Sequence, residues 1–209
     1  MLWTVTALLA SYLLGSLPTA YIFGKVLKGI DIRTVGSGNV GATNAMRVLG
    51  KGPGITVLLL DILKGFVAVV LLGSYFSAKP VLWQEQNLCI IIGLCCICGH
   101  NWTIFLRFKG GKGIATSFGV LLGLALKIEG LGIVIGILIV TWLFVFVTWR
   151  IVSLASIIAA IFLPVACFFF KQPPLLLLVS IILCVFVIIR HKNNLARLFK
   201  GQEDRLRFK

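Results

Sequence analysis

The chain has 209 residues, of which 59% are hydrophobic, and its mean hydropathy is +1.08. A composition this apolar excludes an ordinary soluble domain, and because strand-like alternation of barrel length is absent it predicts an all-α polytopic membrane protein. The formal net charge of +14 does not indicate nucleic-acid binding, since no soluble basic domain is available to hold a nucleic acid. We expect residues 1–209 to form a single integral-membrane domain.

Seven apolar segments are candidates for transmembrane helices, since a helix needs about 20 apolar residues to cross the hydrocarbon core. They cover Leu2–Phe23, Gly54–Phe76, Leu88–Leu106, Ile114–Leu126, Gly130–Trp149, Ile151–Phe170 and Leu175–Ile189. The fourth segment is only about 13 residues or ~20 Å of helix, so we expect it to begin below the headgroups or to be irregular.

The Lys and Arg residues lie mainly on one side of this topology. The regions 25–53, 107–113, 150 and 190–209 hold 16 of the 20, whereas the loops on the other side hold only Lys79, Lys127 and Lys171. Because cytoplasmic loops carry the excess of positive charge, we expect the N-terminus outside and the C-terminus in the cytoplasm.

Between the first two spans lies a polar stretch, Thr34–Gly52, which reads TVGSGNVGATNAMRVLGKG. Its glycines allow backbone amides to turn toward an anion, and Arg47 adds a planar charged group suited to phosphate oxygens. The neutral donors in this stretch are Ser37, Asn39, Thr43 and Asn44. We predict a phosphate cradle, with a flexible loop between helices as the alternative.

The segment Gly36–Gly41 also matches the G-x-G-x-x-G pattern of dinucleotide-binding proteins, and Asp61 follows at a suitable distance. That fingerprint needs a preceding strand and a βαβ unit. Here a membrane-length apolar segment precedes it and Asp61 lies within another, so we reject a dinucleotide site.

Asp61 and Lys64 lie one turn apart inside the second predicted span. Ionisable residues within a membrane face the helix bundle and pair, or they serve function. We favour a buried structural pair that fixes helix orientation, with a catalytic role as the alternative.

A second glycine-rich stretch, Gly99–Thr116, reads GHNWTIFLRFKGGKGIAT. Gly110, Gly111 and Gly113 surround Lys112, which gives another backbone nest with a cation in its middle. A Walker A loop is excluded because Gly113, rather than Ser or Thr, follows the lysine. At the start of a helix the nest also gains the positive end of the helix dipole. A second phosphate site is therefore predicted, with a simple turn as the alternative.

All six cysteines fall in apolar spans. Cys95-x-x-Cys98 lies close to His100, but the second pair of ligands that a zinc site requires is missing. We read these cysteines as small hydrophobic side chains and predict no metal and no cofactor.

The C-terminal part carries two further polar stretches. In the short turn Thr148–Ser153 we interpret Arg150 as an interface anchor. The last span ends at Arg190 and is followed by His191 and Asn194, which are three residues apart and share one helical face. Histidine is the side chain best suited to proton transfer near neutral pH.

Two classes of function fit these features. Two glycine-rich cationic loops and a His/Asn terminus on one membrane face suit an enzyme with two phosphorylated ligands, one of them lipidic. A serine hydrolase is not indicated because no G-x-S-x-G elbow is present. The His-x4-Asp site of acyltransferases that use acyl thioesters is also missing. The alternative is a transporter or flippase for an anionic lipid or phosphate ester, which the intramembrane charged pair supports but the lack of an inverted repeat does not.

The polar stretches resemble the motifs of the bacterial acyl-phosphate:glycerol-3-phosphate acyltransferase family, PlsY. Ser37–Gly50 is similar to SGNxGATNxxRxxG, Gly99–Thr116 to GHxxPxFxxFxGGKGxAT, and His191–Glu203 to HxxNxxRLxxGxE. Arg150, Ser153 and Ser156 match an R-x2-S-x2-S turn, and the resemblance covers the whole chain. The clearest departure is Thr103, where the family usually has Pro; it leaves open the geometry entering Ile104–Phe108.

The resemblance implies transfer of an acyl group from acyl phosphate to the 1-hydroxyl of sn-glycerol 3-phosphate, which yields lysophosphatidic acid and phosphate and begins phospholipid biosynthesis. The residues implied for acyl phosphate are Ser37, Gly38, Asn39, Gly41, Thr43, Gly110, Gly111 and Gly113. Those implied for glycerol 3-phosphate are Arg47, Lys112, Ser153, His191 and Asn194. Of all these, the catalytic ones are Ser37, Arg47, Lys112, His191 and Asn194. A structural or open role is left for Asp61, Lys64, His100, Arg150, Arg197 and Glu203.

The resemblance also implies a multi-pass protein of the bacterial cytoplasmic (inner) membrane, with its active site facing the cytoplasm. The expected partners are membrane lipids, the two substrates and a peripheral enzyme that produces acyl phosphate, but not nucleic acid.

The predicted chemistry depends mainly on positioning. The donor is an activated mixed anhydride, so fixed cations and backbone amides that bring two anions together lower most of the barrier, without a covalent intermediate. We favour proton transfer to a phosphate oxygen of the donor, with His191 as a binding and orienting residue. The alternative is His191 as the general base.

Overall fold

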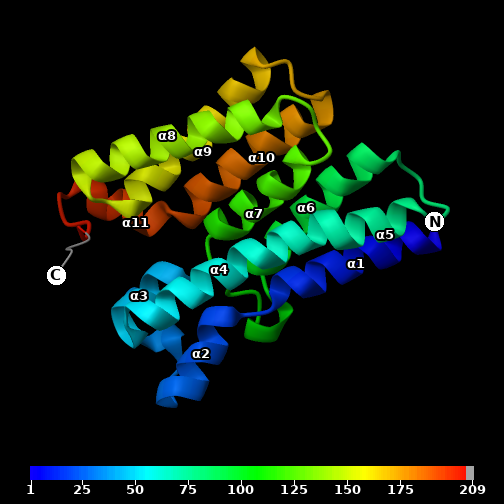
Figure 1. Cartoon of the computed structure of the whole chain (residues 1–209). Helices are drawn as coiled ribbons and strands as arrows, with labels where there is room; N and C mark the ends of the chain where they lie inside the picture. Colours follow the sequence, from blue (N-terminus) through cyan, green and yellow to red (C-terminus); the bar gives the residue numbers. More distant parts are fainter. Residues whose placement is uncertain (206–209) are drawn as a thin grey trace. The chain divides into compact units, whose positions relative to one another are not determined.

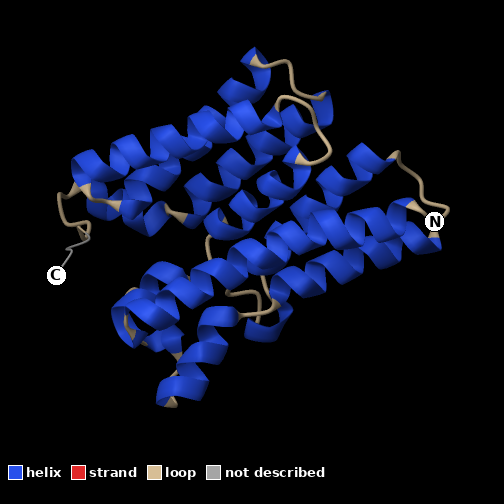
Figure 2. Cartoon of the chain, in the orientation of Figure 1, coloured by secondary structure: helices blue, strands red, loops and turns tan. Residues whose placement is uncertain are grey.

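The computed structural model describes residues 1–205, and within these every regular element is a helix or helical turn (Figures 1 and 2). The predicted cytoplasmic tail 190–209 therefore includes four residues, 206–209, outside the described part. The chain divides into two compact units, Met1–Lys127 and Ile128–Lys209, which we call unit 1 and unit 2 and describe separately.

Unit 1 consists of α1 (Leu2–Ser16), α2 (Thr19–Lys28), η1 (Ile32–Thr34), α3 (Ala42–Leu49), α4 (Lys51–Val67), η2 (Ala68–Leu72), α5 (Gly73–Ser77), α6 (Glu85–Asn101), η3 (Ile104–Leu106) and α7 (Ile114–Ala125). Here η1 and η3 are single 3₁₀ turns and η2 is a π-helical turn. Unit 2 consists of α8 (Leu131–Trp149), α9 (Val152–Phe169), α10 (Pro174–Arg190) and α11 (Lys192–Phe199).

The all-helical membrane class is confirmed, but the count of seven spans is not. Within the described residues, five helical stretches are long and apolar enough to cross a membrane. A sixth is reached if α10 and α11, which are bent by 61° at their junction, count as one span. Helix α7, the segment expected to be short, is apolar but falls below spanning length. The orientation of the chain in the membrane stays a prediction.

In unit 1 the first predicted span is broken at Leu17 and Pro18, between α1 and α2. Proline has no backbone N–H, so a break here leaves helix carbonyls without their usual donors, which is costly in an apolar medium. Two side chains supply hydrogen-bond donors to these carbonyls. Thr103 Oγ1 donates to the Ser16 carbonyl at 2.6 Å, and Lys64 Nζ donates to the Leu17 carbonyl at 3.1 Å.

The hydroxyl of Thr103 thus has a function that the proline usual in the family could not provide. It also accepts a hydrogen bond from the Phe105 amide at 3.3 Å, which starts the turn η3. After this turn, Arg107 and Phe108 both adopt positive φ, and the Phe108 amide donates to the Thr103 carbonyl at 2.8 Å. The geometry entering the second glycine-rich loop is therefore a closed turn anchored on Thr103.

Glycines allow two helix pairs of unit 1 to pack backbone against backbone. A methyl group at Gly15 of α1 would collide with the Cys96 carbonyl of α6, and one at Gly99 would collide with the Tyr12 carbonyl. Gly65 of α4 and Gly119 of α7 make the same close approach to the carbonyls of Thr116 and Ile62. Small residues at such contacts are typical of membrane helices, which associate largely by close packing.

Unit 2 is formed by α8, α9 and α10, each packed against the next in the chain. Most of its buried side chains are apolar, and one of its polar contacts is the hydrogen bond from Trp142 Nε1 to Ser156 Oγ, at 3.3 Å. Ser156, which the family motif singles out, therefore joins α8 to α9. Helix α11 leaves the end of α10 and carries the polar residues of the C-terminal motif.

Candidate active site

Asn44 holds the first glycine-rich loop in shape. Its side chain is almost fully buried; Nδ2 donates to the carbonyls of Ile32 and Val35, at 3.2 and 3.1 Å, while Oδ1 accepts from the Ser37 amide at 2.8 Å. A side chain at Gly36 would collide with Oδ1. Asn44 is thus a brace of the loop rather than the donor to an anion that the sequence suggested.

The internal bonds restrict what the first loop can offer a phosphate. The amides of Ser37 and Gly38 donate to Asn44 Oδ1 and to the Val35 carbonyl, so they point into the loop. The exposed Ser37 can contribute its hydroxyl. The assignment of Ser37 and Gly38 to acyl phosphate stays a prediction, but not one that uses these two amides.

The amides suited to an anion lie further along, where α3 begins. Its N-cap is Gly41, which has no side chain to accept from the first-turn amides of Ala42 and Thr43. Asn39 and Thr43 are half-buried on either side of this helix start, and Arg47 lies exposed one turn further along α3. A phosphate at the start of α3 would therefore meet amides, neutral side chains and the positive helix end.

The second loop rests on the end of α6. The amides of Gly110 and Gly111 donate to the carbonyls of Asn101 and His100, at 3.2 and 3.0 Å. Added methyl groups at these glycines would collide with the His100 carbonyl and ring. Gly110 and Gly111 are thus glycines because the loop lies directly against α6, and their amides are already engaged. Their assignment to acyl phosphate stays a prediction.

Helix α7 begins immediately after this loop, at the N-cap Gly113 with φ of +82°. Two buried oxygen atoms near this start have no hydrogen-bond partner within the described chain, Asn101 Oδ1 and Thr116 Oγ1. Asn101 Oδ1 lies 2.7 Å from where a methyl group on Gly113 would be. Sequence reasoning missed both, although Asn101 and Thr116 fall within the second motif. Their burial beside the loop is visible only in the structure.

The two glycine-rich loops meet within unit 1, as the sequence predicted. Gly111 lies so close to the first loop that an added methyl group would be 2.8 Å from the Val40 carbonyl oxygen. Far from these loops, at the start of α1, the Leu82 amide donates to Thr4 Oγ1 at 3.1 Å. The starts of α3 and α7 are therefore neighbours at the end of unit 1 away from Leu82.

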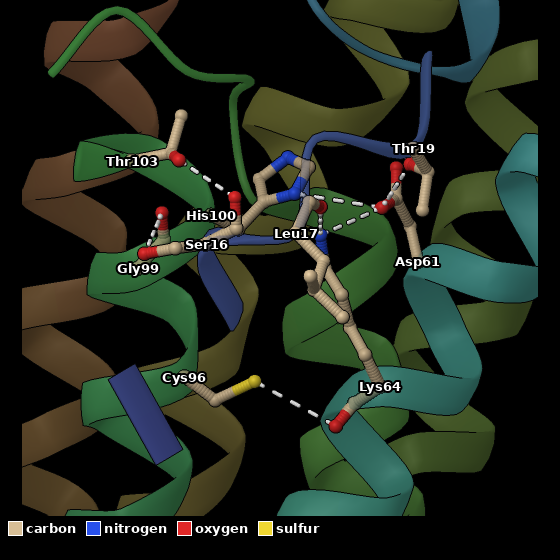
Figure 3. Close-up of polar contacts among 9 residues, drawn as sticks. All are labelled: Ser16, Leu17, Thr19, Asp61, Lys64, Cys96, Gly99, His100 and Thr103. Atoms are coloured by element: carbon tan, nitrogen blue, oxygen red, sulfur yellow. Dashed lines mark hydrogen bonds and ion pairs between the residues drawn. The ribbon is translucent and has the colours of Figure 1, made fainter. Parts of the chain in front are cut away.

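Asp61 and Lys64 form the buried pair predicted from their spacing, with Lys64 Nζ 2.8 Å from Asp61 Oδ1 (Figure 3). The same oxygen accepts from Thr19 Oγ1 at 2.8 Å and faces His100 Nδ1 at 3.6 Å. The pair thus lies between the break in the first span and the end of α6.

In unit 2, Glu203 gathers three polar side chains of the C-terminal motifs. Its Oε1 accepts from Ser153 Oγ at 2.7 Å and from Asn194 Nδ2, and its Oε2 accepts from Arg197 Nε at 2.7 Å. Burial alone would raise the pKa of this carboxyl, but the hydrogen bonds from Asn194, Ser153 and Arg197 together hold the pKa below its usual value. Ser153 and Asn194, both predicted ligands of glycerol 3-phosphate, are thereby brought together on one carboxylate.

His191 lies at the junction of α10 and α11 and is buried. Its Nδ1 is 2.8 Å from the Val187 carbonyl oxygen. A carbonyl only accepts, so Nδ1 carries the hydrogen, and when the ring is neutral its Nε2 is an acceptor. Arg150 lies exposed in the turn between α8 and α9, with a left-handed backbone.

The described residues contain no group of three or more His, Cys, Asp or Glu side chains placed to hold a metal ion.

Comparison with known proteins identifies the family. Residues 5–201 match the family model described as glycerol-3-phosphate acyltransferase. The chain belongs to the glycerol-3-phosphate acyltransferase family. Relatives of that name include one from the cyanobacterium Prochlorococcus marinus, 44% identical over 204 residues, covering 95% of this chain and 92% of the relative. Another, from Fusobacterium nucleatum subsp. nucleatum, is 41% identical over 198 residues and covers 95% of each chain.

Two solved structures share the fold of this glycerol-3-phosphate acyltransferase family member. Both are of PlsY (YgiH), an integral membrane glycerol 3-phosphate acyltransferase. The glycerol 3-phosphate form gives a TM-score of 0.84 at 37% identity and covers 98% of this chain and 96% of that one. The lysophosphatidic acid form gives a TM-score of 0.81 at 36% identity, with 98% and 95% covered. The resemblance to the PlsY family is confirmed.

Proposed function

We propose that this protein transfers the acyl group of acyl phosphate to the 1-hydroxyl of sn-glycerol 3-phosphate. The hydroxyl oxygen bonds to the acyl carbon, the bond from that carbon to the phosphate oxygen breaks, and inorganic phosphate leaves with the hydroxyl proton. Lysophosphatidic acid is the other product. Its formation would make this the first acylation in phospholipid synthesis.

The observation that carries the proposal is the meeting of two glycine-capped helix starts in unit 1, at Gly41 of α3 and Gly113 of α7. Each start presents first-turn amides and the positive end of a helix dipole, which together favour an anion. Such an arrangement suits the phosphate of an acyl phosphate and the charge that develops on it as the acyl bond breaks.

A further finding supports glycerol 3-phosphate as the acceptor. The related PlsY structures are described as glycerol 3-phosphate and lysophosphatidic acid forms, which are substrate and product of the proposed reaction. On the resemblance of the motifs, we assign Ser153, Asn194, His191, Arg47 and Lys112 to glycerol 3-phosphate. Ser153 and Asn194 donate to the carboxylate of Glu203.

We place the proton on a phosphate oxygen of the donor, with His191 as a binding and orienting residue. In the neutral Nδ1–H tautomer of His191, Nε2 is an acceptor that can orient a glycerol hydroxyl. The same tautomer is required of a general base, so a substitution must decide between the two (see Discussion).

The intramembrane pair that is the main support for the transporter alternative makes structural contacts. The intramembrane pair Asp61 and Lys64 makes bonds to Thr19 and to the Leu17 carbonyl, which are the needs of a broken helix.

The test is turnover by the purified protein. With acyl phosphate as donor, phosphate release should require glycerol 3-phosphate and should match lysophosphatidic acid formed, and no divalent metal should be needed. Acyl-CoA and acyl carrier protein should not serve as donors. Comparable turnover with acyl-CoA would contradict the proposed donor. Movement of labelled glycerol 3-phosphate or lipid across vesicles without acylation would instead establish the transporter.

The protein is further proposed to act at the cytoplasmic face of the bacterial inner membrane. Membrane lipids surround it, and a peripheral enzyme that makes acyl phosphate is a candidate partner.

A further inference from the structure

The cluster around Asp61 has more connections than a buried ion pair requires. Lys64 alone would balance the carboxylate, and Lys64 also completes the helix break through the Leu17 carbonyl. Yet Asp61 Oδ1 also faces Nδ1 of His100, 3.6 Å away, and His100 belongs to a different helix, α6 (Figure 3). The Asp61 carboxylate on α4 therefore contacts the His100 imidazole, a contact that the helix break at Leu17 does not require.

The other edge of the same ring lies against the second glycine-rich loop. A methyl group at Gly111 would collide with His100 Nε2 and would lie 2.8 Å from Cε1. The loop is bound to the same residue through its backbone, because the Gly111 amide donates to the His100 carbonyl at 3.0 Å. His100 thus fills the space between the Asp61 carboxylate and the loop that carries Lys112.

The orientation of the His100 ring consequently sets the position of the loop. An imidazole side chain has a broad, roughly two-fold preference about its second torsion, so a contact is needed to select one edge for the loop. Asp61 supplies that contact, with its Oδ1 3.6 Å from Nδ1. Gly111 also approaches the Val40 carbonyl of the first loop, so a shift of Gly111 would disturb both loops.

We propose that Asp61 is a positioning residue for the phosphate-binding loop Gly110–Gly113, and that it acts through the imidazole of His100. The inference rests on the proposed function, since it assumes that this loop receives the phosphate of the acyl donor. Neither residue is assigned a direct contact with substrate.

The test is a cycle of substitutions in the full-length protein, read as KM and kcat with acyl phosphate. Asp61→Asn alone would leave the Lys64 charge buried without its partner, which endangers folding. The combined variant Asp61→Asn/Lys64→Met removes both charges with little change in volume. It also removes the Lys64 donor to the Leu17 carbonyl, so its unfolding temperature is measured beside KM. The second arm is His100→Ala, and the third combines all the substitutions.

Asp61→Asn/Lys64→Met should raise the KM for acyl phosphate roughly tenfold with a smaller effect on kcat, because a displaced loop binds the phosphate less well. His100→Ala should raise it at least as much. The combined variant should be no worse than His100→Ala, since residues that act through one another are not additive. The matched control is Glu85→Gln, a carboxylate paired with Lys127 at the far end of α6, and its KM should equal that of the unaltered protein.

Two outcomes would overturn the proposal. One is a lowered unfolding temperature with unchanged KM in Asp61→Asn/Lys64→Met, which would make the pair a brace of the helix break only. The other is full additivity with His100→Ala.

Inorganic phosphate, which can bind without turnover, is the probe that separates failure of the positioning role from failure of the proposed donor. If the unaltered protein does not use acyl phosphate, the proposed function fails. A rise in unfolding temperature with added phosphate, lost in both variants, would still support the positioning role. No rise in the unaltered protein, or an equal rise in the variants, would contradict it.

Discussion

Arg47 and Lys112 are the two cations placed beside the starts of α3 and α7, and each is predicted to make a charge-assisted contact with a phosphate. Such contacts are worth about 1.5–3 kcal/mol, so Arg47→Ala and Lys112→Ala should each reduce kcat/KM roughly 10- to 100-fold. The matched control is Arg150→Ala, which should do less if Arg150 is only an interface anchor. Near-normal kinetics in both of the first two variants would refute the pair of phosphate cradles.

His191 presents Nε2 as an acceptor because its Nδ1 hydrogen is directed at the Val187 carbonyl. His191→Gln places an amide near Nε2 but cannot titrate, so it separates orientation from proton transfer. We expect appreciable residual activity, with the acid limb of the pH profile unmoved. Complete loss of turnover with unchanged affinity for glycerol 3-phosphate would make His191 the base instead.

At the scale of elements, the break between α1 and α2 depends on a donor from the turn that follows α6. Thr103→Val keeps the shape but leaves the buried Ser16 carbonyl without the hydroxyl that donates to it at 2.6 Å. Leaving a buried acceptor unpaired costs about 1–3 kcal/mol, so the unfolding temperature should fall, measured in detergent. Thr103→Ser retains the hydroxyl and should stay close to the unaltered protein. A fall in Thr103→Ser with none in Thr103→Val would show that the methyl group, not the hydrogen bond, matters.

The joining of α9, α11 and the segment after α11 depends on the ionised form of Glu203. Because the folded pKa of this carboxyl is lowered, its stabilising contribution is present above its unfolded pKa and is lost as the pH falls through the folded pKa. Glu203→Gln should therefore lower the unfolding temperature at neutral pH and flatten its decline under acidic conditions. Glu129→Gln, at an exposed carboxylate just before α8, is the control and should leave the profile unchanged. Identical acid profiles for Glu203→Gln and the unaltered protein would contradict this role.

At the scale of the whole molecule, the charge asymmetry predicts which loops face the cytoplasm. The exposed positions Val35, Pro80 and Lys200 offer single cysteine sites in a background without the six native cysteines, which lie in helices. With an impermeant thiol reagent on intact cells, position 80 should react, whereas 35 and 200 should react only after the membrane is opened. Labelling of position 35 from outside would place the first glycine-rich loop on the wrong face.

Much of the site was predictable because its chemistry is local in sequence. The helical membrane class follows from long apolar segments, which can satisfy their backbone in lipid only as helices. The two loops follow from glycines clustered with cations, and the Asp61–Lys64 pair follows from spacing of one helical turn. These features depend on residues that are close together in the chain, so a single sequence reveals them.

The remaining features were decided only by tertiary contacts. Whether an amide faces a ligand or a protein carbonyl depends on which distant group lies beside it, and no pattern shows that the amides of Gly110 and Gly111 meet the end of α6. Asn44 resembles a ligand donor in the sequence, yet burial turns its amide group onto the loop itself. The number of spanning helices was also beyond reach, because a short helix such as α7 is stabilised by packing against α4 rather than by its own length. The sequence also left open the roles of Glu203 and His100. Their partners, Ser153 and Asp61, come close to them only when the chain folds.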